Sequence, residues 1–132
     1  MVSSNIRALV IEDNAVHAKL ILSLLAKAEA VSFDVVHVET LAAGLNCLAQ
    51  DPIDIVLLDL VLPDSQELDT FLRLKNEVPD IPVVILSGLE DINLAARAVE
   101  AGAQAYLIKG QINSAQLERS IRYAIERTRA QS

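Results

Sequence analysis

Five polar side chains that can act as ligands or nucleophiles stand directly after short apolar segments of the sequence. Glu12 and Asp13 follow the first of these segments, Asp59 the second, Ser87 the third and Lys109 the fourth. If the segments are strands of one sheet, three carboxylates meet at one edge and repel one another unless a cation lies among them. Mg²⁺ prefers hard oxygen ligands and often keeps waters and phosphate oxygens. The pattern therefore predicts a divalent-metal site.

The hydroxyl of Ser87 and the ammonium of Lys109 extend this chemistry. Together they could hydrogen-bond and neutralise the oxygens of a phosphoryl group that passes in line to a carboxylate. Asp59 follows the segment expected at the centre of the sheet and is the predicted nucleophile. Strand ends often carry polar caps, and any one of these residues alone would more often be such a cap. Five of them in register are harder to explain in that way.

Five segments have the composition of buried strands. They are short, rich in Val, Ile and Leu, and most of them end abruptly at polar residues. The second alternates more between apolar and polar residues than the others. The predicted strands are residues 6–11, 33–38, 53–58, 81–86 and 105–108.

The stretches between and after these strands have apolar residues at helical spacing, such as Leu117, Ile121 and Ile125 in the last of them. Two pairs have the spacing of a capping box, in which a helix-capping side chain is answered three residues later. These pairs are Asp64 with Glu67 and Asn113 with Gln116. Five helices therefore alternate with five strands. This alternation predicts a five-stranded parallel, doubly wound α/β sheet with its ligands at the carboxyl ends of the strands.

Composition limits the function classes. The formal net charge of −7 over 132 residues argues against direct contact with nucleic acid. The charge is uneven, because residues 1–108 hold 16 acids and 6 bases whereas residues 109–132 hold 2 acids and 5 bases. Cys47 is the single cysteine, so no internal disulfide is possible. No apolar stretch reaches the roughly 18 residues of a membrane span, and we expect a cytoplasmic protein with no membrane partner.

Four sequence blocks resemble the conserved blocks of bacterial two-component response-regulator receiver domains. They are similar to those of the chemotaxis response regulator. The blocks are LVIEDN at 9–14, IVLLDLVLPD at 55–64, VVILSG at 83–88 and AYLIKG at 105–110. The resemblance covers about residues 6–127. It implies one receiver domain over residues 1–132, with a flavodoxin-like (βα)5 fold of strand order 2-1-3-4-5. The C-terminal end of the last helix is expected to be either a solvated end or a dimer contact or connector to an effector.

The resemblance also implies a role for each residue of the site. Asp59 is expected to be the phosphoacceptor and a metal ligand. Asp13 is the expected direct ligand of Mg²⁺, Glu12 a ligand directly or through water, and Val61 a ligand through its backbone carbonyl. Lys109 is expected to pair with the phosphoryl group.

Two further residues are expected to change position on phosphorylation. Ser87 would be drawn toward the phosphoryl oxygen, and Tyr106 matches the rotating aromatic of the family. A strand aromatic that is half packed on the core is the simpler interpretation of Tyr106. The expected readout surface comprises the fourth helix, fifth strand and fifth helix, through which a homodimer or an effector could bind. The fifth helix carries Arg119, Arg122, Arg127 and Arg129.

The resemblance implies that the phosphoryl donor is a phosphohistidine on a sensor histidine kinase or phosphotransfer protein. The chain would catalyse only its own phosphorylation and dephosphorylation, and it is otherwise not expected to be an enzyme. A pseudo-receiver that keeps the fold without the chemistry is the alternative. An enzyme on a flavodoxin-like fold is disfavoured because the turn EDNAVH, at residues 12–17, is not a glycine-rich phosphate loop.

The sequence departs from the family pattern at several positions. Gly110 stands where a cis proline is common. We expect a trans bond or a rearranged loop there, because a cis bond before a non-proline residue costs about 2.5 to 4 kcal/mol. Glu67 replaces a common glycine and is read as the capping partner of Asp64. Val61 and Leu89 are apolar and cannot hydrogen-bond an attacking water, which predicts slow hydrolysis of the phosphorylated form.

The two histidines receive structural interpretations. His17 follows Asp13 by one helical turn and could be imagined as a phosphodonor or a fourth metal ligand, but a position on the helix surface is expected. His37 lies in the second strand without an acidic or cysteine partner at ligand spacing.

Overall fold

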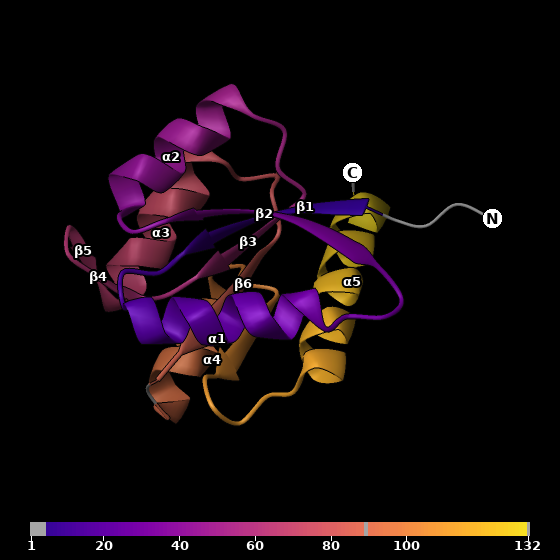
Figure 1. Cartoon of the computed structure of the whole chain (residues 1–132). Helices are drawn as coiled ribbons and strands as arrows, with labels where there is room; N and C mark the ends of the chain where they lie inside the picture. Colours follow the sequence, from indigo (N-terminus) through magenta and orange to yellow (C-terminus); the bar gives the residue numbers. More distant parts are fainter. Residues whose placement is uncertain (1–4, 89, 132) are drawn as a thin grey trace.

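A five-stranded parallel sheet forms the centre of the molecule (Figure 1). The computed structural model describes residues 5–88 and 90–131. The sheet order is β2-β1-β3-β6-β7, which is the predicted flavodoxin-like order once the two strands of an additional hairpin are counted. The strands are β1 (Asn5–Ile11), β2 (Ser32–Val38), β3 (Ile55–Leu58), β6 (Val83–Ser87) and β7 (Ala105–Ile108).

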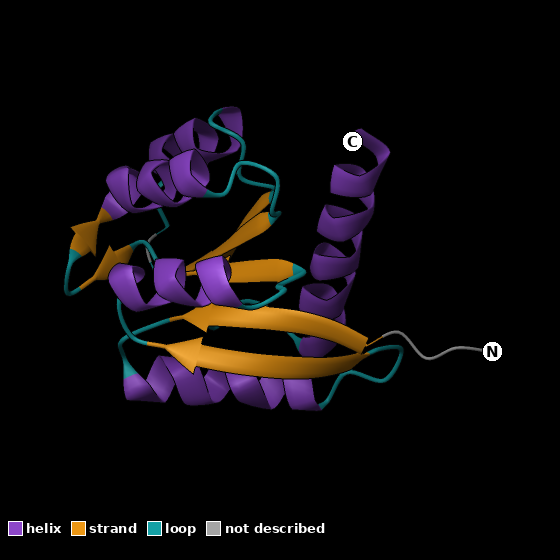
Figure 2. Ribbon diagram, turned by 90° about the horizontal axis from the view of Figure 1, so that it is seen from above, coloured by secondary structure: helices purple, strands orange, loops and turns teal. Residues whose placement is uncertain are grey.

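Helices cover both faces of this sheet (Figure 2). They are α1 (Ala15–Ala26), α2 (Leu41–Gln50), α3 (Glu67–Glu77), α4 (Ile92–Glu100) and α5 (Ser114–Gln131). No helix within the described part of the chain is both long enough and apolar enough to cross a membrane.

Two apolar layers hold the helices to the sheet. Side chains alternate across a strand, so Ala8 and Val10 of β1 face one layer while Leu9 and Ile11 face the other. The first layer is completed by α1 and α5, through residues such as Ile21 and Leu117, and the second by apolar residues of α2, α3 and α4. Strands that are buried on both faces explain why the predicted strands are nearly continuous apolar runs.

A short antiparallel hairpin follows β3 and was not predicted from the sequence. It pairs β4 (Val61–Leu62) with β5 (Ser65–Gln66). A hydrophobic period cannot be recognised in strands of only two residues. The buried Thr70 side chain of α3 anchors the hairpin, because its hydroxyl donates to the Leu60 carbonyl at 2.9 Å and lies 2.9 Å from the Ser65 hydroxyl.

The prediction that Asp64 and Glu67 form a capping box at the third helix was wrong. The Asp64 carboxylate instead accepts hydrogen bonds from the backbone of Leu41 at 2.9 Å and Ala42 at 3.0 Å, at the start of α2. Desolvation raises the pKa of Asp64, but the hydrogen bonds from these N–H groups outweigh it and hold the pKa below its ordinary value. A carboxylate at a helix N-terminus also satisfies free N–H groups and the helix dipole. Asp64 therefore ties the hairpin to α2.

Glu67 begins α3 in a left-handed conformation, with φ of 51°. Gln66 is the residue before α3 and makes no side-chain capping hydrogen bond. A glycine would adopt this backbone conformation without the steric cost that a side chain brings. The substitution of Glu67 for a common glycine thus leaves the turn geometry in place.

The other local predictions agree with the structure. The Asn113 side chain accepts a hydrogen bond from the Gln116 backbone at 2.8 Å, and the Gln116 side chain accepts one from the Asn113 backbone at 2.9 Å. This reciprocal pair is the predicted capping box of α5. No cis peptide bond occurs within the described residues, and Gly110 takes a φ of 83°.

Gly44 of α2 provides a test of the packing between this helix and β1. A methyl group at Gly44 would clash with Cδ1 of the fully buried Ile11 and lie 3.1 Å from its Cγ1. We expect Gly44→Ala to lower the free energy of unfolding by about 1 to 3 kcal/mol through overpacking, although alanine favours helix by about 1 kcal/mol. Urea denaturation measures the change.

The matched control for this test removes the atom that clashes. Ile11→Val deletes Cδ1, so Gly44→Ala should cost less in the Ile11→Val protein than in the natural one. An equal cost in both proteins would show that contact with Ile11 is not the cause.

Candidate functional site

Backbone hydrogen bonds place the predicted site residues at one edge of the sheet. The Asp59 N–H donates to the Ile11 carbonyl at 3.0 Å, and the Lys109 N–H donates to the Ser87 carbonyl at 2.8 Å. The Glu12 N–H donates to the carbonyl of Val38 at 3.0 Å. Each bond extends the sheet ladder by one residue past the end of a strand. The predicted residues from β1, β3, β6 and β7 therefore converge.

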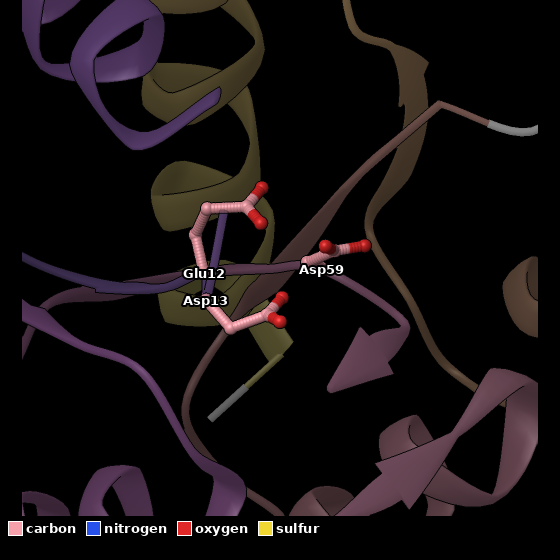
Figure 3. Close-up of side chains that lie close together, drawn as sticks. All are labelled: Glu12, Asp13 and Asp59. Atoms are coloured by element: carbon pink, nitrogen blue, oxygen red, sulfur yellow. The ribbon is translucent and has the colours of Figure 1, made fainter. Parts of the chain in front are cut away.

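The carboxylates of Glu12, Asp13 and Asp59 form one acidic cluster (Figure 3). Each offers an oxygen that lies within 4.8 Å of the others. Glu12 and Asp59 are buried and Asp13 is exposed, so the cluster opens to solvent on the side of Asp13. Three oxygen ligands with one open side suit a small divalent cation that keeps some of its waters.

Lys109 lies against this cluster and balances part of its charge. Its ammonium pairs with the carboxylates of Glu12 and Asp59, at 3.1 Å from Asp59 Oδ2, and its side chain is 6% exposed. Three carboxylates and one ammonium leave two net negative charges when all four groups are ionised. This charge balance could hold a divalent cation next to the ammonium of Lys109.

Glu12 has an unusual protonation equilibrium. Burial raises its pKa from 4.5 to about 7; the hydrogen bond from Lys109 opposes this rise and nearby Asp59 adds to it. The Asn14 N–H, 3.1 Å from Glu12 Oε2, also favours the ionised form. Near pH 7 Glu12 thus holds a proton part of the time, and a cation that binds there competes with that proton.

Asp59, the candidate nucleophile, also holds the segment that follows it. The Val61 N–H donates to Asp59 Oδ1 at 3.2 Å, while Oδ2 accepts from Lys109. The Val61 side chain is 40% exposed. A role for the Val61 carbonyl as a metal ligand stays a prediction.

Ser87 and Tyr106 occupy the strand positions that were predicted. Ser87 ends β6 and is 1% exposed. Tyr106 pairs with Ile85 in the sheet, is half-buried and packs against the second apolar layer. It also borders a surface hollow of about 430 Å³ between β7 and α5, which Tyr123 lines from the helix. Movement of either residue stays a prediction, and Leu89 lies outside the described residues.

His17 is a site neighbour that the sequence interpretation missed. It is half-buried, and its Nδ1 lies 3.1 Å from Lys109 Nζ. His37 has the structural role expected of it, because its Nε2 lies 2.7 Å from the backbone carbonyl of Glu12. The one available signal for His17 was its position one helical turn after Asp13.

Comparisons with known proteins agree with the fold and the acidic cluster described above. The family described as "Response regulator receiver domain" matches residues 8–122. The regulatory protein LuxO of Vibrio cholerae serotype O1 is 33% identical over 99 residues, which are 75% of this chain and 21% of LuxO. The DNA-binding transcriptional regulator NtrC of Rhizobium meliloti is 32% identical over 101 residues, 76% of this chain and 20% of NtrC. The chain thus spans about a fifth of the length of these curated relatives.

Solved structures extend the likeness to the fold. A response regulator receiver domain protein from Clostridium thermocellum is 26% identical with a TM-score of 0.81, covering 96% of this chain and 99% of that one. A signal receiver domain from Vibrio parahaemolyticus is also 26% identical, with a TM-score of 0.79 over 96% of this chain and 95% of that one. The family match runs from β1 into α5 and includes every residue of the acidic cluster and Lys109. The chain therefore belongs to the response regulator receiver domain family.

Proposed function

We propose that the chain is the phosphoacceptor switch of a two-component phosphorelay and that Asp59 takes the phosphoryl group. The observation that carries the proposal is the convergence of Glu12, Asp13 and Asp59 with Lys109 at one edge of the sheet. The donor is a phosphohistidine on a sensor histidine kinase or a phosphotransfer protein. A pseudo-receiver without this chemistry remains the alternative that the first test below decides.

The step is a group transfer without redox change. A carboxylate oxygen of Asp59 attacks phosphorus, an acyl phosphate bond forms, and the phosphorus–nitrogen bond to the donor imidazole breaks. The imidazole nitrogen leaves with a proton from the donor or from water. Lys109 is already within hydrogen-bonding distance of Asp59 and supplies a positive charge to the transferred oxygens. Ser87 supplies a hydroxyl from the end of the neighbouring strand β6.

Mg²⁺ fits the donor set. Glu12, Asp13 and Asp59 offer carboxylate oxygens within one small volume, and we assign the backbone carbonyl of Val61 as a further ligand. The ion, when bound, neutralises charge on the transferring phosphoryl group. The chain's own contribution is to hold the three carboxylates together by burying two of them, in spite of their mutual repulsion.

The proposed readout surface comprises α4, β7 and α5. Its apolar side chains include Ile92 at 86% exposure, Val99 at 49% and Tyr123 at 54%. Two of the arginines of α5 are bound within the chain, because Arg127 donates to Gln104 and Arg122 pairs with Glu118. We assign this surface to a homodimer or an effector, with Ser87 and Tyr106 as the switch residues.

The remaining assignments concern the protein as a whole. We place residues 1–132 in one receiver domain with a core at about 6–127, and the end of α5 is a possible connector. The acidic chain contacts no nucleic acid itself, catalyses only its own phosphorylation and dephosphorylation, and acts in the cytoplasm.

Incubation with Mg²⁺ and a small phosphodonor such as acetyl phosphate tests the central assignment. We expect intact mass to increase by one phosphoryl group, because Asp59 follows the central strand β3 and its carboxylate pairs with Lys109. The gain should require Mg²⁺ and should vanish in Asp59→Asn. A folded protein that binds Mg²⁺ and gains no phosphoryl group would instead be a pseudo-receiver.

Magnesium affinity should depend on pH through Glu12. With a pKa of about 7, Glu12 is largely protonated at pH 6 and ionised at pH 8. A proton that must leave before the ion binds weakens the apparent affinity about tenfold per pH unit below the pKa, so the Kd should be about tenfold higher at pH 6 than at pH 8. Isothermal titration calorimetry measures it.

Glu12→Gln is the control for this pH dependence. The amide cannot titrate, so Mg²⁺ should bind this variant more weakly, with little change between pH 6 and pH 8. In the metal-free natural protein, the proton on Glu12 stabilises the native state below pH 4.5 and this stabilisation is lost as the pH rises through about 7. Equal Mg²⁺ affinity of the natural protein at both pH values would contradict the assignment.

The lifetime of the phosphorylated form should be long. Val61 is exposed beside Asp59 but has no group that can hydrogen-bond an attacking water. We expect Val61→Asn to shorten the lifetime by roughly 2- to 10-fold, the effect of one added hydrogen bond. Loss of the phosphoryl group after donor removal measures this rate. Val61→Ala tests whether the valine side chain only shields the phosphoryl group from water. An equal acceleration by alanine would exclude the hydrogen-bond explanation.

A further inference from the structure

The contact between His17 and Lys109 joins α1 to the site. His17 Nδ1 lies 3.1 Å from the Lys109 Nζ. An ammonium can only donate hydrogen bonds, so Nδ1 must be the acceptor and carries no proton in this arrangement. The ring is therefore neutral, and its proton lies on Nε2.

His17 is held firmly in the first turn of α1. The Asn14 side chain caps this helix by accepting hydrogen bonds from the backbone of Val16 at 2.9 Å and His17 at 3.0 Å. Ile21 and Leu25, further along α1, are buried in the first apolar layer. The helix is thus fixed at both its start and its buried face, which sets the position of the imidazole.

Three groups that can accept a hydrogen bond surround the Lys109 ammonium, which has three N–H groups. Two are the carboxylates of Glu12 and Asp59, and the third is His17 Nδ1. The Lys109 side chain is 6% exposed, which leaves water little access to replace a missing acceptor. A neutral acceptor satisfies the third N–H without adding a negative charge to a site that already contains three carboxylates.

We propose that neutral His17 is a positioning residue that holds the Lys109 ammonium in place for phosphoryl transfer to Asp59. The inference rests on the proposed function and adds a residue to its machinery. His17 acts through Lys109, whose long flexible side chain could otherwise point its charge elsewhere.

The charged and titratable groups near the imidazole come from several elements. The Lys109 ammonium contacts the ring, and the same ammonium pairs with Glu12 and Asp59. Of the elements packed on α1, β2 carries His37, bonded to the Glu12 carbonyl, and α5 carries Glu118, near the far end of α1. Because several groups meet at Lys109, only a difference between matched variants isolates His17.

Two substitutions separate the acceptor from the rest of the side chain. Asn places an oxygen as many bonds from the backbone as Nδ1, whereas Leu has no acceptor and suits a helix. At pH 7.5, with saturating Mg²⁺ and acetyl phosphate as the donor, we expect His17→Leu to slow phosphorylation about three- to tenfold. His17→Asn should stay within about twofold of the natural protein, and circular dichroism checks that both variants fold.

Asparagine restores the acceptor but not the ring, so recovery of the rate in His17→Asn is a readout that a purely structural role would not give. Identical rates for the natural protein, His17→Leu and His17→Asn would overturn the inference while leaving the proposed function intact. Absence of phosphorylation in the natural protein would overturn both.

Nitrogen NMR of the imidazole tests the contact without any phosphodonor. The natural protein at pH 7.5 should show His17 protonated on Nε2 and bare on Nδ1. Lys109→Met removes the donor and should shift the Nδ1 resonance, whereas Lys19→Met, on an exposed position of the same helix, should not. A proton on Nδ1 in the natural protein would refute the arrangement directly.

Discussion

The fold gathers three carboxylates where their repulsion is strongest, and Lys109 is the group that makes this arrangement tolerable. Glu12 and Asp59 are both buried, and both meet the same ammonium. Charges in such surroundings interact far more strongly than in water. The raised pKa of Glu12 shows that one ammonium does not fully compensate for burial. The remaining negative charge would favour a divalent cation at this cluster.

The scaffold creates this conflict because its strands all end at one edge. Burial on both faces of the sheet fixes β1, β3, β6 and β7 through two apolar layers, and these layers contain none of the site's charged residues. The residues that stabilise the sheet are therefore different from the charged residues of the site. The apolar runs define the sheet, and polar residues that follow β1, β3 and β7 meet in one cluster. The core can tolerate substitutions of the site residues, whereas a substitution at Gly44 changes the packing of the core itself.

Most of the fold and much of the site could be predicted because both depend on local patterns. Continuous apolar runs revealed the sheet strands, and their polar ends revealed Glu12, Asp13 and Asp59. The failures at Asp64 and His17 share a physical cause, which is that distant segments override local spacing. Asp64 has the spacing to cap α3, yet it bonds to α2, 22 and 23 residues away. The partner of His17 lies 92 residues away in the sequence, and no period along α1 could indicate it.

The start of α3 depends on contacts with other segments of the chain. Glu67 takes a left-handed conformation, which costs a non-glycine residue about 1 to 2 kcal/mol, and the helix lacks a side-chain cap. The turn between Asp59 and α3 is therefore kept in shape by tertiary bonds, those of Thr70 to the hairpin and of Asp64 to α2. The shape of this turn thus depends on the hydrogen bonds of Thr70 and Asp64, whereas the sheet is held by its apolar layers.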